Sequence, residues 1–162
     1  MKTKNNQLLE DQDFVLWVQL RQARDAVFKA REKELSQYGI SVMQSAILLH
    51  IKILGEKATI GEISRWVLRE PNTVSVNLSR MEKQGLVIKG KSRSGKKSIV
   101  YITLTDKGEQ ALKQSLKRES IRDIMSCLSS EEERKQLSSS LIKLRNKALK
   151  GLMPISELPP FP

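Results

Sequence analysis

This sequence has little of several things on which whole classes of protein depend. Among its 162 residues it has one cysteine, Cys127, and one histidine, His50, so it offers neither a disulfide framework nor a cysteine-histidine cluster for zinc. Only 4% of the residues are aromatic, and no glycine-rich loop of the phosphate-cradling kind is present. We therefore expect no metal, no cofactor and no catalytic residues, and the chain offers no room for a catalytic domain beside its other elements.

Long hydrophobic runs are also missing. No stretch approaches the roughly 18 to 20 apolar residues that cross a bilayer, and the start "MKTKNNQLLEDQD" lacks the apolar core of a signal peptide. We therefore expect a cytoplasmic protein with no membrane partner. The hydrophobic content of 39% still suffices for one compact domain, or for a small domain with a helical extension.

Acidic residues are scarce in one part of the chain. The formal charge is +11, and residues 71–104 contribute seven cations against a single acid, Glu82. The stretch "KGKSRSGKKS", Lys89 to Ser98, has five cations and no acid. Such a concentration favours a polyanionic partner, either nucleic acid or an acidic membrane surface.

Apolar periodicity predicts a series of helices in the first half. A first helix spans about residues 11–37 and ends at Gly39. Ser41 with Gln44, and Thr59 with Glu62, have the spacing of capping boxes and start two more helices, the second ending near Leu68. A fourth helix starts at Pro71 and ends at Gly85, so two short helices meet across a tight turn.

After Gly85 the pattern changes to β-branched alternation. "LVIKGK" and "SIVYITLT" predict two strands, and the cationic stretch is interpreted as the loop of their hairpin. Helical spacing returns from Thr105, and Ser129 with Glu132 predicts the start of a last helix. The tail "MPISELPPFP" is too rich in proline to be helical, and it either packs on a partner or frays.

This order of elements is that of a winged helix-turn-helix, mainly α with a small β-hairpin wing, a fold that places its last helix in the DNA major groove. In the recognition helix, about 71–84, the apolar residues Val74, Leu78 and Met81 should face the core. The outward residues suit base edges and phosphates. They are Asn72, Thr73, Ser75, Val76, Ser79, Arg80 and Lys83.

The stretch "ISRWVLREPNTVSVNLSRMEKQGLVIK", followed by "YITLTDKG", resembles the MarR family of bacterial transcription regulators over about residues 59–108. The resemblance implies a homodimeric double-stranded DNA-binding regulator, more often a repressor, with a palindromic or pseudo-palindromic operator. It implies an N-terminal dimerisation helix at 11–37, a winged helix-turn-helix unit at 40–105, C-terminal dimerisation helices at 106–150 and a tail at 151–162. The half-sites would lie about 34 Å apart, one helical turn of DNA.

The resemblance also assigns roles to individual positions. Residues 72–80 align with the part of the helix that contacts bases and phosphates, and the wing, 89–98, would reach the minor groove. The wing cations predicted to contact DNA are Lys91, Arg93, Lys96 and Lys97. The family usually has an Asp-Arg pair where this chain has Gly95, Lys96 and Lys97, so we expect the wing tip to supply affinity more than sequence choice. Asn77 replaces a common aliphatic residue and either hydrogen-bonds within the unit or turns toward DNA.

Other interpretations compete with this one. The cationic stretch by itself would be a solvated loop, and charge alone would make the protein a non-specific nucleic-acid or membrane-surface binder. Cys127 is expected to be an inert packed residue and His50 a structural one. A small-molecule effector is a partner that the resemblance adds, with Trp17, Tyr38, Met43 and Trp66 as pocket or core residues; a regulator without an effector is the alternative.

Overall fold

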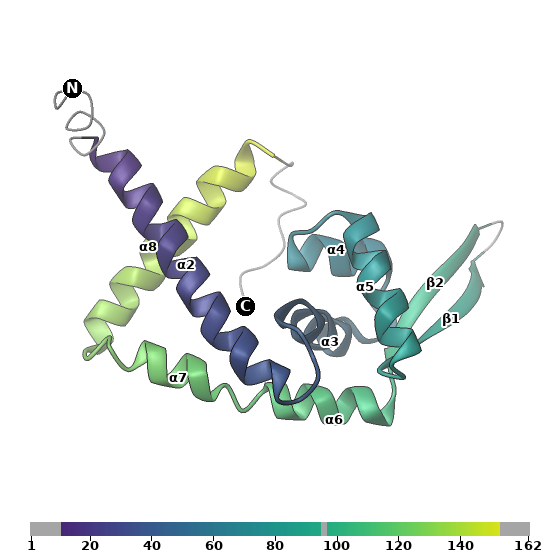
Figure 1. Ribbon diagram of the computed structural model, residues 1–162. Helices are drawn as coiled ribbons and strands as arrows, with labels where there is room; N and C mark the ends of the chain where they lie inside the picture. The colour runs from purple at the N-terminus through teal and green to yellow at the C-terminus, as the bar shows by residue number, and fades with distance from the viewer. Residues whose placement is uncertain (1–10, 95–96, 153–162) are drawn as a thin grey trace, which may run out of the picture.

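The computed structural model describes residues 11–94 and 97–152, with the side chains of 92–98 left out of the description. Its elements are α2 (Gln12–Ser36), α3 (Val42–Leu54), the short 3-10 helix η1 (Gly55–Lys57), α4 (Ile60–Val67), α5 (Pro71–Lys83), β1 (Val87–Ser94), β2 (Lys97–Leu104), α6 (Asp106–Ser115), α7 (Glu119–Met125) and α8 (Glu131–Lys150). The predicted mainly helical fold with one β-hairpin is confirmed. Figure 1 shows the hairpin and the long helices α2 and α8 at opposite ends of the molecule.

Side-chain caps fix where several helices begin. Asp11 accepts hydrogen bonds from the N–H groups of Asp13 and Phe14 and starts α2. The predicted capping box of Ser41 and Gln44 is present at the start of α3. The box predicted for Ser129 and Glu132 was wrong by one residue, because Ser130 and Glu133 form it; Ser129 Oγ donates to the same Glu133 carboxylate at 3.1 Å.

The core forms around α3, the most apolar helix, which contributes Ile47, Leu48 and Ile51. The other helices of the unit and both strands close over it. The buried cluster consists of Leu35, Ile40, Ile47, Leu48, Ile51, Ala58, Ile63, Val74, Leu78, Met81, Leu86, Val87, Ile102 and Leu112. The cluster therefore takes in the end of α2 but leaves out most of α2 and all of α8.

The turn between α4 and α5 is set by two residues. Leu68 ends α4 in the left-handed conformation, with φ 52°, which is uncommon for a residue that carries a β-carbon. Pro71 then occupies the first turn of α5, where a missing N–H is tolerated. The predicted helix boundaries near Leu68 and Pro71 are confirmed.

The hairpin is longer than the sequence suggested. β1 pairs antiparallel with β2 from Val87 opposite Leu104 out to Ser94 opposite Lys97. The interpretation of Lys89 to Ser98 as a hairpin loop was therefore wrong, since most of it is paired strand; glycine and serine lowered its apparent β propensity, but the ladder continues through them. A single bridge from Thr59 to Tyr101 ties the start of α4 to β2.

The helix α6 packs on the same core. Leu112 is buried with α3 residues, and Gly108 lies so close to the base of β1 that a β-carbon on it would come within 2.1 Å of the Leu86 carbonyl oxygen. Glycine at this position permits the close approach. α6 begins the segment 106–150 that was predicted to supply dimerisation helices, and within the single chain it packs against α3 and β2.

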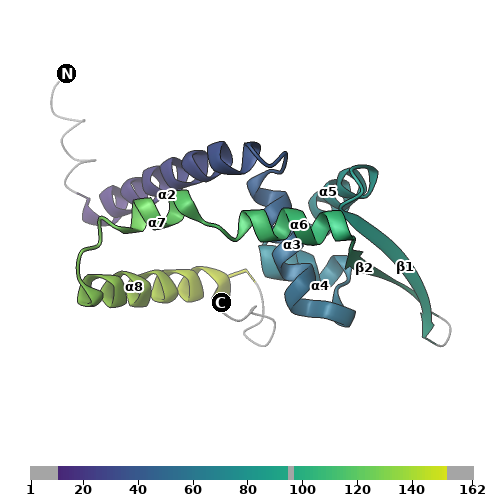
Figure 2. The same cartoon turned by 90° about the horizontal axis from the view of Figure 1, so that it is seen from below.

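The chain then continues through α7 to α8. Figure 1 shows α8 crossing the direction of α2, and Figure 2 shows the two helices apart from one another at the end of the molecule away from the hairpin. In the residues described, no helix combines the length and apolar character that a bilayer crossing requires. The tail predicted to pack on a partner or fray falls, from residue 153 onward, outside the described residues.

Candidate DNA-binding surface

The helix α5 presents one stripe of side chains to solvent. At 3.6 residues per turn, Asn72, Val76, Arg80 and Lys83 lie within about 80° of one another around the helix. All four are exposed, as is Thr73 at the edge of the stripe. Val74, Leu78 and Met81 are fully buried on the opposite side, as predicted. The stripe therefore offers an amide, a hydroxyl, an apolar methyl surface and two cations, which are the groups that read base edges and phosphates.

Two predicted contact residues, Ser75 and Ser79, are less exposed than this stripe. Both are half-buried, and Ser79 faces the hairpin. Lys89 of β1 donates to Ser79 Oγ at 3.2 Å and forms an ion pair with Glu82 at 2.8 Å. The structure thus separates the predicted set into five exposed residues and two half-buried serines, of which Ser79 contacts Lys89 at the base of the wing.

Asn77, the residue with two open interpretations, bonds within its own helix. Its side-chain amide donates to the Thr73 carbonyl oxygen at 2.8 Å, one turn earlier. This bond occupies one of the two amide N–H donors and agrees with the first alternative.

The start of α5 suits an anion. No side chain caps its first N–H groups and its first turn carries no acid, although the N-cap residue, Glu70, has a carboxylate directly before that turn. Unpaired N–H groups at a helix N-terminus, together with the positive end of the helix dipole, attract phosphate.

The wing extends the basic surface away from α5 (Figure 1). Lys91 is exposed on β1, opposite Val100. The backbone of Arg93 lies opposite Ser98, and that of Lys97 opposite Ser94, at the far end of the ladder. Lys96 lies outside the described residues. The pairing shows why the sequence pattern alone could not place these cations: their register depends on where the turn falls.

The four residues considered for an effector pocket do not gather at one place. Trp17 stacks with Phe14 at 5.8 Å on α2, Trp66 contacts the His50 ring at 5.4 Å, and Lys117 lies over Tyr38 at 5.5 Å. Met43 packs against the core. Cys127, which we expected to be packed, is exposed on the single chain.

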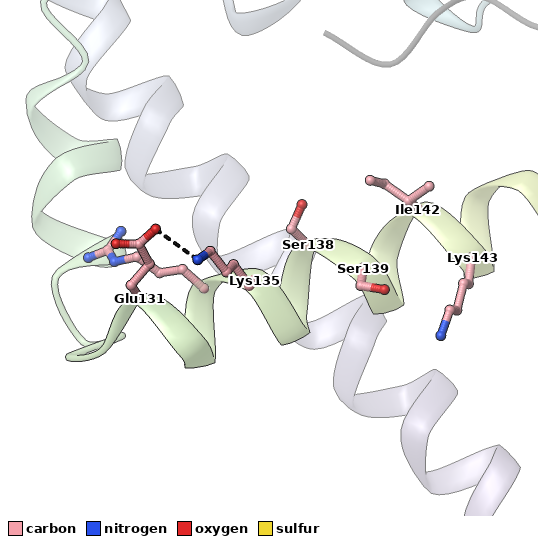
Figure 3. A pocket seen from close by; sticks show the side chains of 7 residues that line it. Glu131, Lys135, Ser138, Ser139, Ile142 and Lys143 are labelled. Carbon is pink, nitrogen blue, oxygen red and sulfur yellow. Dashed lines mark ion pairs between the residues drawn. The ribbon is translucent and has the colours of Figure 1, made fainter.

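A shallow hollow on α8 is not an enclosed binding site either. Its described lining residues all belong to that one helix, and Figure 3 shows them along its length. They are Glu131, Arg134, Lys135, Ser138, Ser139, Ile142 and Lys143. Glu131 and Lys135 form an ion pair of 3.1 Å across one turn. This surface is an open face of a helix.

Comparison with known proteins identifies the family. The model of the MarR family matches residues 38–98. The organohalide-sensing transcriptional regulator RdhR-CbdbA1625 is 32% identical in sequence, with a TM-score of 0.82 over 94% of this chain and 90% of that one. This chain belongs to the MarR family. Members of this family are transcription regulators and not enzymes. No curated protein sequence matches this chain.

Solved MarR-family structures extend the likeness. A MarR family protein from Bacillus stearothermophilus is 25% identical, with a TM-score of 0.65 over 86% of this chain and 97% of that one. MepR from S. aureus, solved as a complex with DNA, shares the fold at 22% identity and a TM-score of 0.72, covering 80% of this chain and 96% of that one. The RdhR-CbdbA1625 regulator has also been solved with 2,4-dichlorophenol bound.

Proposed function

We propose that this MarR-family chain is a homodimeric, sequence-specific repressor of transcription that acts in the bacterial cytoplasm. α5 enters the major groove of double-stranded DNA, and the hairpin of β1 and β2 reaches the adjacent minor groove. The observation that carries the proposal is the exposed stripe of Asn72, Thr73, Val76, Arg80 and Lys83 beside a cationic wing. The DNA complex of the similarly folded MepR supports it.

The dimer is supported by the apolar side chains that the single chain leaves in solvent. On α2 these include Trp17 at 57% and Leu20 at 42% exposure, and on α8 Leu144 at 55%. Contiguous apolar surface of this kind marks an interface in a monomer that is otherwise well packed. A two-fold dimer would present two copies of α5 to successive major grooves, which requires a palindromic or pseudo-palindromic operator.

The test is selective binding to one genomic site. Purified protein is incubated with sheared genomic DNA at physiological salt, bound fragments are sequenced, and the recovered site is footprinted. We expect a protected palindrome that random competitor DNA displaces only at about 1,000-fold excess or more. Equal competition by random DNA would instead establish the alternative, a non-specific nucleic-acid binder.

Asn72→Ala sharpens that test, with Ser75→Ala as its matched control. Asn72 lies in the exposed stripe and Ser75 on the half-buried side, so the first change should alter which base pair is preferred by about 1 to 3 kcal/mol. Ser75→Ala should leave the preferred site unchanged. Uniform weakening of Asn72→Ala on all variant sites would contradict direct readout by α5.

We further propose that a small aromatic molecule relieves repression. Trp66 Nε1 is buried and has no hydrogen-bond partner among the described residues, beside the His50 ring. An unpaired buried donor is uncommon in a native fold, and a ligand oxygen would satisfy it. The dichlorophenol complex of RdhR-CbdbA1625 supports the class of ligand.

The test is titration of the protein–operator complex with chlorinated phenols. The phenols should release the DNA from the wild-type protein and not from Trp66→Phe. No release from the wild-type protein would favour regulation without such an effector.

A further inference from the structure

Two charged residues near the end of α2, Arg31 and Glu34, are almost completely buried. Their side chains are 10% and 8% exposed, and Arg31 Nη1 lies 2.6 Å from Glu34 Oε2. Burial of an ion pair costs free energy unless further hydrogen bonds satisfy both partners. The position of those further bonds therefore indicates what the pair holds in place.

Glu34 caps a helix that begins 85 residues later in the chain. Its carboxylate accepts hydrogen bonds from the backbone N–H of Glu119 at 3.0 Å, from that of Ser120 at 3.2 Å, and from Ser120 Oγ. The residue in the N-cap position of α7, Arg118, provides no side-chain cap and has φ 54°. Glu34 therefore performs the capping that the local sequence does not provide.

The carboxylate of Glu34 is held in its charged form. Burial raises its pKa, but hydrogen bonds from Ser120 Oγ, Arg31 and the backbone of Glu119 and Ser120 outweigh burial and lower the pKa to about 2. At neutral pH the contact is thus one between an anion, a guanidinium and the N–H groups at the start of a helix.

Arg31 binds the chain on the other side of residues 116–118, the connection between α6 and α7, which forms a joint between these helices. Its Nη2 donates to the carbonyl oxygen of Ser115, the last residue of α6. Arg31 and Glu34 thus hydrogen-bond the end of α6 and the start of α7 to one turn of α2. Residues 116–118 lie between these two contacts. Figure 2 shows α6 and α7 in succession, with α7 beside α2 and α6 extending beyond the end of α2 toward the hairpin.

The joint lies between the two functional parts of the molecule. α6 is packed against α3 and the base of the wing through Leu112 and Gly108, so it moves with the unit that carries α5. α7 packs on α2 and leads directly into α8, the helices that carry the proposed dimer surface. In the proposed dimer, a change of angle between α6 and α7 would move α5 relative to the two-fold axis.

We propose that Arg31 and Glu34 are positioning residues that fix the angle between the DNA-binding unit and the dimerisation helices, and with it the separation of the two recognition helices. The proposal rests on the proposed function, because it assigns the pair a role in operator recognition without contact to DNA. A helix-to-helix separation held by a defined joint should appear as a preference for one half-site spacing.

The experiment compares wild type with Glu34→Gln on a series of operators in which one to three base pairs are added or removed between the half-sites. Wild type should show a sharp optimum. In Glu34→Gln we expect affinity at the optimum to fall by about 3- to 30-fold and affinity at neighbouring spacings to fall less, so that the profile broadens. An equal loss at all spacings would mean that Glu34 serves stability alone and would overturn the proposal.

Glu32→Gln is the matched control. It removes the same charge from the same helix, but Glu32 accepts from the backbone N–H of Val42 at 3.1 Å, a bond between α2 and α3 that does not involve α7. Its spacing profile should keep the wild-type shape. A broadened profile in this variant as well would show that the joint has no special role.

A second measurement does not require DNA. A spin label on Lys83→Cys, with Cys127→Ser removing the native thiol, reports the distance between the two α5 helices of a dimer. The distribution should be narrow in wild type and broader in Glu34→Gln. An unchanged width would overturn the inference while leaving the proposed function intact; absence of any inter-label distance would overturn both, because no dimer would be present.

Discussion

The two ends of this molecule bury their apolar residues to different degrees. In the winged helix-turn-helix unit, Ile47, Leu48, Val74, Leu78 and Ile102 are all fully buried. On α2 and α8, by contrast, Leu16 is 62% exposed and Leu144 55% exposed. Both ends carry helices with large apolar side chains, but only the first end has enough elements around it to cover them. The unit can therefore hold its shape within one chain, whereas the long helices need another protein surface to cover their apolar side chains.

The largest expected effect comes from placing a charge on α8, within the proposed dimer surface. Leu144→Glu would bury a carboxylate without a partner in the proposed interface, at a cost of about 3 to 5 kcal/mol, so the dimer dissociation constant should rise by at least about 100-fold. Sedimentation equilibrium measures this directly. Ser139→Glu adds the same charge on the opposite side of α8 and should leave the dimer intact; dissociation in both variants would remove the distinction between the two faces.

A cavity in the core of the winged helix-turn-helix unit should lower the stability of the chain without changing dimer formation. Leu78→Ala removes a fully buried side chain of α5 and should lower the free energy of unfolding by about 3 kcal/mol. Urea unfolding followed by circular dichroism checks the value. Val76→Ala, on the exposed stripe of the same helix, should change it by less than about 0.5 kcal/mol. Similar losses in the two variants would mean that the unit is not packed as described.

Acid should loosen the joint between the two ends. The pKa of Glu34 is lowered to about 2 from an ordinary 4.5, so its stabilisation is fully present above pH 4.5 and is lost as the pH falls toward 2. After allowance for solvent screening, the loss should be about 2 kcal/mol. Thermal unfolding between pH 5 and 2 should show this dependence in wild type, and a pH profile of the same slope in Glu34→Gln would contradict it.

The smallest expected effect is a gain. Leu68 adopts the left-handed conformation at the end of α4, which costs a residue with a β-carbon roughly 1 to 2 kcal/mol. Leu68→Gly removes this strain but adds freedom to the unfolded chain, so the net stabilisation should be about 0.5 to 1 kcal/mol. Leu68→Ala keeps the β-carbon and should give no gain in melting temperature; equal gains would point to the exposed leucyl side chain and not to the backbone.

Much of the fold could be predicted from sequence because its signals are local. Capping residues such as Ser41, the proline at 71 and the glycines at 39 and 85 mark helix ends by chemistry that acts over a few residues. The exposed stripe of α5 followed equally from helical periodicity alone. These are the features on which the prediction and the structure agree.

Features that depend on distant residues could not be predicted in the same way. The strands continue through Gly90 and Ser92 because a partner strand pairs with them, although their own propensity favours a loop. The break between α6 and α7 depends on Glu34, which lies more than 80 residues earlier. Ser79 looked like a contact residue by position, and only the approach of Lys89 shows that it faces the wing.

The ion pair between Lys89 and Glu82 affects how DNA binding should respond to ions. Each lysine or arginine that neutralises a phosphate releases condensed counterions, so the slope of log affinity against log salt counts such residues. Residues 71–104 contain seven cations, but Lys89 is already neutralised 2.8 Å away by Glu82. A count from sequence therefore overestimates the slope by about 0.9 per subunit. Lys89 instead connects β1 to α5 through Ser79 and Glu82, and the remaining cations supply the positive charge of the binding surface.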